Sequence, residues 1–374
     1  MGGSKVRRIL LGAAAPVTAL IGAAIIIVLL LLAAGHNPLA AFEAMAGSYS
    51  DPSVVMGAVN QTTVFYLSAV AVAIGFKMNL FNIGVDGQYR LAALIAAAFA
   101  GMTAMGSLPS VLRIAATLVV AMAVGAIWSG IAGWLRVTRG VSEVISTIML
   151  NAISTALIAF LLTTDRLAIQ QGYNVMTRPI TAGGKVPNFD VGAGTPLYSL
   201  ILLGVLIGVA YWFLLNRTVF GFSIRATGMS ETAAIASGIS VKKMVFSTML
   251  LSGAVAGLVG MPELLNGSAG SYSLNFQTGI GFTGIAIALL GRNHPVGIVF
   301  AAALWSFLAS SSNALQSVQV PKEMVAIMQG IIVLLVVIAY EIVRRAGVVL
   351  EQREVARQLA VAEVVAETPA GVTP

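Results

Sequence analysis

The feature that most constrains this chain is a series of about ten apolar stretches, most of them near 20 residues long, separated by short polar segments. An α-helix needs about 20 residues to cross the hydrocarbon core of a bilayer. Only helices and closed barrels satisfy all of their backbone hydrogen bonds in lipid. We therefore predict an all-α integral membrane protein with about ten transmembrane helices. The expected spans are Leu11–Ala34, Val54–Gly75, Leu91–Met105, Leu112–Leu135, Val144–Leu162, Leu197–Leu215, Met244–Met261, Thr278–Leu290, Val296–Ala314 and Val325–Val343.

Composition agrees with this class and argues against others. Hydrophobic residues make up 58% of the 374 residues and charged residues only 9%, against about 25% charged residues in ordinary soluble domains. The net charge of +7 is carried by short segments beside apolar stretches, so we expect no nucleic-acid partner. With no cysteine and only two histidines, we expect no metal site and no disulfide.

The basic residues predict the orientation of the chain. If the N-terminus lies inside, five of the 21 Lys and Arg residues fall outside, namely Arg113, Arg166, Arg178, Lys185 and Lys322. The other sixteen then fall inside, as the positive-inside rule requires, and both termini are predicted to be cytoplasmic. The apolar run that begins at Leu11 exceeds the roughly 7 to 15 residues of a cleavable signal peptide, which favours a membrane anchor.

We divide the chain into a transmembrane domain, residues 1–343, and a cytoplasmic tail, residues 344–374. The tail loses its apolar periodicity, so we expect it to be partly disordered. Within the transmembrane domain, the longest inner loop comprises residues 216–243 and the longest outer loop residues 163–196.

The inner loop carries the signals of a short helix. Ser230 can cap a helix from Glu231 to Ser237, and Gly238 suits a left-handed stop after it. Such a helix on a membrane face either docks a partner or is a surface turn without one. Composition alone leaves these two interpretations about even.

Two polar islands interrupt the apolar pattern: Phe76–Gln88, which reads FKMNLFNIGVDGQ, and Asn266–Gly281. Aspartate at the centre of a spanning helix costs about 2.5 to 3.5 kcal/mol, so such residues usually face a protein interior or a watery path. Interrupted spans at matching positions are typical of inverted repeats, here spans 2–5 and 7–10. The alternative is that both islands are ordinary loops. The expected residues of a translocation pathway or gate are Asn79, Asn82, Asp86, Gln88, Asn275, Gln277 and Thr278.

A polar stripe follows the fifth expected span. Glu143, Thr147 and Asn151 are spaced by four residues, so they share one helix face. This face either lines a pathway or packs against a neighbouring helix, and we favour packing slightly, because Thr and Asn commonly hydrogen-bond between membrane helices.

Motifs of enzymes are missing from the chain. It contains no G-x-x-x-x-G-K-[ST] phosphate loop, no G-x-S-x-G and no H-E-x-x-H. We therefore expect a transport subunit rather than an enzyme, and if ATP drives transport, a separate subunit must hydrolyse it.

Three segments together resemble a known family: Asn79–Gln88 (NLFNIGVDGQ), Gly140–Asn151 (GVSEVISTIMLN) and Gly221–Val241 (GFSIRATGMSETAAIASGISV). They resemble the permease subunits of ABC importers for simple sugars and nucleosides, the branched-chain-type permeases, and are most similar to the nucleoside branch. That branch typically reads NLFNIGVEGQ in the first segment, so Asp86 stands where Glu is usual. The resemblance extends over most of the chain from about Val54 to Val343.

The resemblance implies a fold like that of the vitamin B12 importer permease, in a multi-pass protein of the bacterial cytoplasmic (inner) membrane. It also implies alternating access between two permeases, with a heterodimer favoured over a homodimer. The further partners would be two ATPase subunits or domains that hold ATP and Mg, and an extracytoplasmic binding lipoprotein, while this chain holds no cofactor. The residues that would couple to the ATPase are Arg225, Ser230, Glu231, Thr232, Ala233, Ala234 and Gly238.

Three alternatives to a nucleoside importer stay open. A simple-sugar, or pentose, ABC importer has the same family motifs. An ion-coupled secondary transporter also uses inverted repeats and broken helices, with Asp86 as the coupling carboxylate. A scaffold protein of the membrane would tolerate replacement of its polar islands. The motifs and the long inner loop favour the ABC importer, but the sequence does not identify the substrate.

Overall fold

The structure, a computed structural model, describes residues 20–268, 270–339, 341–342, 345 and 352. The chain divides into two compact units: Phe42–Val318, and a smaller unit that combines Met1–Ala41 with Gln319–Pro374. The smaller unit contains the helices Leu20–Ala33 and Glu323–Ala339. The start of the first expected span and nearly all of the expected tail lie outside the described residues.

The larger unit is mostly helical. The helix α2 crosses the boundary between the two units, and all later labelled elements lie within the larger one. The helices are α2 Pro38–Ser48, α3 Pro52–Phe76, α4 Val85–Ala100, α5 Ser110–Arg139, α6 Glu143–Leu161, α7 Ile201–Arg217, α8 Val219–Met229, α9 Glu231–Ala236, α10 Val241–Gly257, α11 Met261–Asn266, α12 Ile280–Leu290, α13 Pro295–Ser310 and α14 Ser312–Ser317. Two short 3-10 helices cover Thr103–Ser107 and Ala182–Gly184.

Several of these helices are long and apolar enough to cross a membrane. Among the described residues five qualify, or up to seven if each of two bent helix pairs counts as one span. The five are Pro52–Phe76, Ser110–Arg139, Glu143–Leu161, Val241–Asn266 and Pro295–Ser317. The chain is therefore a helical protein with several candidate spans, and the total of ten stays a prediction.

The third expected span begins earlier than predicted. The helix α4 starts at Val85 instead of Leu91, so Asp86 and Gln88 lie in its first turns and not in an irregular break. A carboxylate is favourable in the first turn because the positive end of the helix dipole lies there. In addition, the side-chain oxygen of Asn82 accepts a hydrogen bond from the Gly84 amide at 3.1 Å, which stabilises the turn into the helix.

The expected outer loop contains a small β-hairpin that the sequence reading did not predict. Strands β1, Ala168–Gln171, and β2, Asn174–Thr177, pair antiparallel. Gly172 lies between them with φ of 61°, the left-handed conformation that a two-residue hairpin turn requires. This hairpin is the one β-sheet in the described part of the chain, which is otherwise mostly helical.

The core of the larger unit depends on small residues. Helix α3 is largely buried and contacts α7, α10, α12 and α13. Helices α5 and α10 make the most extensive contact between two elements, and their backbones meet at Gly125 and Gly253. Small residues allow helices in membranes to approach closely enough for extensive van der Waals contact.

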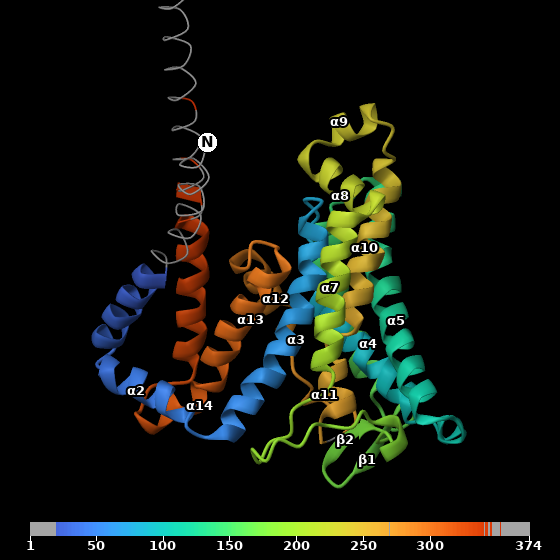
Figure 1. Cartoon of the computed structure of the whole chain (residues 1–374). Helices are drawn as coiled ribbons and strands as arrows, with labels where there is room; N and C mark the ends of the chain where they lie inside the picture. Colours follow the sequence, from blue (N-terminus) through green and yellow to red (C-terminus); the bar gives the residue numbers. More distant parts are fainter. Residues whose placement is uncertain (1–19, 269, 340, 343–344, 346–351, 353–374) are drawn as a thin grey trace, which may run out of the picture. The chain divides into compact units, whose positions relative to one another are not determined.

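The two long loops of the prediction lie at opposite ends of the larger unit. Figure 1 shows α8 and α9 at one end and the β1–β2 hairpin at the other, with α5, α7 and α10 running between them. Loops that lie on opposite sides of a membrane must be separated in this way.

Candidate functional site

The two polar islands meet where α4 and α12 begin. The Asp86 carboxylate in the first turn of α4 accepts a hydrogen bond from the Gly281 amide of α12, with 3.3 Å between Oδ1 and N. About one helical turn further along α4, the Tyr89 hydroxyl donates to the Gln277 backbone carbonyl at 2.6 Å. A side chain at position 281 would collide with the Asp86 backbone, so glycine permits the contact. The islands therefore form one junction.

Several groups that favour an anion surround the buried carboxyl group of Asp86. Asp86 is 6% exposed and lies at the N-terminal ends of both α4 and α12, where helix dipoles favour an anion. The Arg90 guanidinium lies 3.8 Å from its second carboxylate oxygen. Arg90 also donates to the Thr155 hydroxyl at 3.2 Å. Asp86 thus joins two short helices, in addition to any role in transport.

Asn82 and Gln88 form a closed hydrogen-bonded pair that is fully buried. The Asn82 amide donates to the Gln88 carbonyl oxygen at 3.0 Å and to the Ser252 hydroxyl at 2.8 Å. In return, the Gln88 amide donates to Asn82 Oδ1 at 2.8 Å. Asn82 thus links the turn between α3 and α4, residues 77–82, to α10, and neither side chain faces open space.

The polar residues of the second island are arranged differently. Asn275, Gln277 and Thr278 are exposed on the larger unit. The Gln277 and Gln61 side-chain amides lie 3.4 Å apart, so α3 contributes a further polar group to the same surface. Of the seven expected pathway residues, these three and Asn79 are exposed, whereas Asn82, Asp86 and Gln88 are buried.

The polar stripe on α6 packs against the first island. The Asn151 amide donates to the Ile83 carbonyl at 2.9 Å, and its oxygen accepts from the Gly87 amide at 2.9 Å. Thr147 is fully buried and donates to the Glu143 carbonyl at 2.7 Å. Through Asn151 the stripe thus supplies hydrogen-bond partners to backbone groups of the first island.

The other end of the first island reaches the α8–α9 region. Asn79 has a backbone φ of 55°. Its side-chain amide donates to the Gly228 backbone carbonyl of α8 at 2.7 Å. Glu143 accepts a hydrogen bond from the Phe81 amide at 3.2 Å and forms an ion pair with Arg136 of α5. Sequence reasoning missed Arg136, whose one signal was its place seven residues before Glu143 across the Gly140 turn.

The predicted cap of the short helix in the inner loop is present. The Ser230 hydroxyl accepts a hydrogen bond from the Ala233 amide at 3.3 Å, and the helix α9 ends at Ala236, one residue before the predicted end. Gly238 then adopts φ of 79°, as a left-handed stop requires. The local sequence was sufficient here because cap and stop are both short-range.

The expected coupling residues divide into two groups. Glu231, Thr232 and Ala233 are exposed, whereas Ala234 is only 2% exposed and anchors α9 to the rest of the unit. On α8, one terminal nitrogen of Arg225 is buried without a hydrogen-bond partner among the described residues.

Lys77, just after α3, lies in the field of other cations. Burial lowers the pKa of its ammonium group, and the positive charges of Arg225 and Arg292 lower this pKa further. This end of the larger unit is therefore strongly basic, and an anionic group would be attracted to it.

The far end of the larger unit is organised around Asn266, which sequence reasoning did not single out as a contact residue. Its amide donates to the Asn188 side chain at 2.6 Å and to the Val186 carbonyl at 3.2 Å. Its side-chain oxygen Oδ1 accepts from the Leu200 backbone amide at 3.3 Å. Asn266, at the end of α11, therefore links the outer loop, residues 163–196, to the helices.

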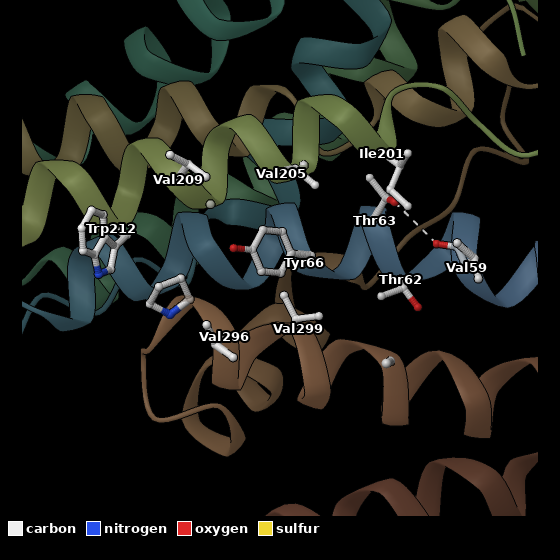
Figure 2. A pocket seen from close by; sticks show the side chains of 14 residues that line it. Val59, Thr62, Thr63, Tyr66, Ile201, Val205, Val209, Trp212, Val296 and Val299 are labelled. Carbon is white, nitrogen blue, oxygen red and sulfur yellow. Dashed lines mark hydrogen bonds between the residues drawn. The ribbon is translucent and has the colours of Figure 1, made fainter. Parts of the chain in front are cut away.

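A separate cavity of about 550 Å³ lies between α3, α7 and α13. Figure 2 shows Tyr66 of α3 in its middle, with Val205 of α7 on one side and Val299 of α13 on the other. The lining is almost entirely apolar, and none of the expected pathway residues belongs to it. Among the described residues, no group of three or more His, Cys, Asp or Glu side chains is placed to hold a metal ion.

The chain is similar in sequence to known proteins over most of its length. A family model described as branched-chain amino acid transport system / permease component matches residues 54–337. The guanosine ABC transporter permease protein NupP of Bacillus subtilis is 35% identical over 307 residues, which cover 79% of this chain and 84% of NupP. The glucose ABC transporter permease protein TsgB13 of Haloferax volcanii is 32% identical over 303 residues, 77% of each chain.

A second guanosine ABC transporter permease protein of Bacillus subtilis, NupQ, is 25% identical over 260 residues, which cover 66% of this chain and 77% of NupQ. No solved structure matches the chain.

Proposed function

Because the chain belongs to the branched-chain amino acid transport permease family, and is thus the permease subunit of an ABC transporter, we propose that it carries nucleosides into the cell. The family predicted from the three sequence motifs is confirmed. With its several apolar helices, the chain is a multi-pass protein of the bacterial inner membrane.

The observation that carries the nucleoside proposal is the 35% identity to a guanosine permease over 79% of this chain. A second candidate is a simple sugar, which the 32% identity to a glucose permease supports. Both candidates are ABC importers, and membership in this family disfavours an ion-coupled secondary transporter. The substrate class therefore needs a direct test.

The proposed complex contains further subunits. Two ATPase subunits or domains would bind ATP and Mg, since this chain has no G-x-x-x-x-G-K-[ST] phosphate loop. The exposed residues Glu231, Thr232 and Ala233 of the capped helix α9 would dock one ATPase. A binding lipoprotein would deliver the substrate to the end of the β1–β2 hairpin. Two permeases would form a heterodimer, and the similarity to two guanosine permeases of one Bacillus species supports this pairing.

The proposed topology has ten spans, a fold like that of the vitamin B12 importer permease, and both termini in the cytoplasm. The short helices α4 and α12 support the inverted arrangement, because each begins at the junction of Asp86 and Gly281. Discontinuous helices whose N-termini meet near a binding site are a recurrent feature of inverted-repeat transporters.

In this proposal the exposed polar groups of the second island contact the substrate as it passes. Asn275 and Gln277 carry amides that both donate and accept hydrogen bonds, and Thr278 adds a hydroxyl. Ribose hydroxyls and the edges of bases present the complementary groups. Alternating access requires two states of similar free energy, and ATP binding to the partner would shift their populations.

Uptake measurements test the substrate class. The chain, its partner permease, the ATPase and the binding protein are reconstituted in liposomes, and labelled guanosine, uridine, ribose and glucose are offered at equal concentration. We expect ATP-dependent, saturable uptake of the nucleosides and at most a tenth of that rate for the sugars. A preference for ribose or glucose would replace the nucleoside by a sugar, and uptake driven by a proton or sodium gradient without ATP would contradict the whole proposal.

A further inference from the structure

The turn between α3 and α4, residues 77–82, is in contact with the α8–α9 region at two points. The first is a close backbone approach: a side chain at Gly228 would collide with the Lys77 carbonyl and lie 3.0 Å from the Met78 Cα atom. The Asn79 amide donates to the Gly228 carbonyl at 2.7 Å across the same contact. Because no side chain separates the two backbones, a movement of α8 toward the α3–α4 turn must displace that turn.

The second contact is a chain of charged groups. The guanidinium of Arg136, in the last turn of α5, forms an ion pair with Glu143, and its second terminal nitrogen lies 3.8 Å from the Glu231 carboxylate of α9. The other Glu143 oxygen accepts a hydrogen bond from the Phe81 amide at 3.2 Å. A continuous path of polar contacts thus runs from α9, through α5 and α6, to the α3–α4 turn.

Burial distinguishes the two carboxylates that share Arg136. The side chain of Glu143 is 4% exposed, and that of Glu231 is 58% exposed. A buried charge that loses its partner is strongly destabilised, so Glu143 retains Arg136. An exposed ion pair contributes little, so Glu231 can exchange its partner when another protein docks. The weak end of the path lies on the surface, where a docked partner would act.

The path requires the geometry of arginine. Its planar guanidinium has five N–H donors and can face two carboxylates at once, whereas the lysine ammonium is a compact point charge. The inner end of the path leads further into the junction, because Phe81 adjoins Asn82, whose side chain is hydrogen-bonded to Gln88 in α4. Displacement of the turn therefore reaches the helix that carries Asp86.

We infer that Arg136 is a positioning residue of the transport cycle, which links the docking helix α9 to the α3–α4 turn through Glu143. The inference rests on the proposed function, in which α9 docks an ATPase. Arg136 contacts neither substrate nor ATP in this role. Its removal therefore separates ATP hydrolysis from transport in the complexes that assemble.

Arg136→Gln is tested in the complete reconstituted complex, with ATP hydrolysis and nucleoside uptake measured per assembled transporter. We expect ATPase binding within about twofold of the unmodified complex and about a tenfold loss of uptake per ATP, a size common for couplings between sites. Arg139→Gln is the matched control: Arg139 lies in the same last turn of α5 and is exposed. Arg139→Gln should leave the uptake per ATP unchanged. Arg136→Lys should lose less uptake per ATP than Arg136→Gln and more than Arg139→Gln.

A double-mutant cycle with Glu231→Gln identifies the route. If Arg136 acts through Glu231, the double variant loses no more uptake per ATP than the stronger single variant, whereas independent residues give additive losses. If Arg136→Gln fails to assemble, Arg136→Lys, which keeps a cation beside Glu143, serves in the same cycle. Additive losses, or an unchanged ratio in Arg136→Gln, would overturn the role of Arg136. Absence of ATPase binding or uptake in the unmodified complex would instead contradict the proposed function.

Discussion

Asn82 and Asn275 are the same residue type in matching polar islands, yet they occupy opposite environments. Asn82 is fully buried with every amide group paired, whereas Asn275 is exposed. An asparagine side chain donates and accepts in either setting, so its presence in an island does not reveal which setting it has. The sequence locates the polar islands, and the tertiary structure separates their buried residues from their accessible ones.

Asn82→Leu should therefore weaken the fold. The substitution leaves the Gly84 backbone amide and the Gln88 side-chain amide without their acceptor, and it removes one of the two hydrogen bonds of the Ser252 hydroxyl. Each buried polar group without a partner costs about 1 to 3 kcal/mol, so we expect a loss of about 3 kcal/mol or more in the free energy of unfolding. Thermal unfolding of the purified permease in detergent measures the loss, and an unchanged midpoint would contradict the closed pair.

Asn275→Leu is the matched substitution in the second island. Because Asn275 is exposed and has no hydrogen bond to the described residues that Leu would break, we expect the unfolding midpoint to stay within about 1 °C, the effect of a few tenths of a kcal/mol. Uptake by the reconstituted complex should fall, because a polar contact of the proposed pathway is removed. Normal uptake would exclude Asn275 from the pathway.

At the scale of elements, the sequence predicted a helix well where the residues that begin and end it are neighbours in the chain. The cap at Ser230 and the stop at Gly238 define α9 from the sequence alone. The start of α4 was missed because its stabilising groups are not local to one cap position: they come from Asn82 on the preceding turn and from Asn151 on α6. The β1–β2 hairpin was missed because each strand has only four residues.

Ser230→Ala should weaken docking of the ATPase. Loss of an N-cap costs about 1 kcal/mol, and α9 has too few residues to hold its conformation without it. We expect the affinity of the ATPase for the permease to fall about fivefold, the factor that 1 kcal/mol represents. The control is Ser223→Ala, which removes a hydroxyl from α8 that donates to the Val219 carbonyl and caps no helix. Equal binding by both variants would mean that α9 is not the docking element.

At the scale of the whole molecule, helices are held together by contacts between residues far apart in the sequence. The backbones of α5 and α10 meet at Gly125 and Gly253, and the junction of α4 with α12 joins Asp86 to Gly281. Neither pairing can be read from hydropathy, because glycines and apolar residues occur throughout the chain. The same is true of Arg136, whose importance depends on an ion pair with Glu143 across a turn and a contact with Glu231 from a third element.

Gly253→Val should therefore disrupt the larger unit. The added side chain would meet the backbone oxygen of Gly125, and backbone cannot move aside as a flexible side chain can. Overpacking of a core costs about 1 to 3 kcal/mol and more where backbone must shift, so we expect a strongly reduced yield of folded protein and a lower unfolding midpoint. Gly106→Val, where nothing lies within 4 Å of the added carbon atom, should leave both unchanged. A normal yield and midpoint for Gly253→Val would refute the close approach of α5 and α10.

The class, the family and the positions of the polar islands follow from the amino-acid sequence, because apolar length, charge asymmetry and short motifs are local and persist in any conformation of the chain. Which polar residues stabilise the fold and which remain accessible follows only from the tertiary structure. Whether an amide faces a partner or open space, and which two carboxylates share Arg136, depends on helices that lie more than 60 residues apart in the chain, such as α3 and α6. Side-chain chemistry determines what each group can bind, and only packing decides what it meets.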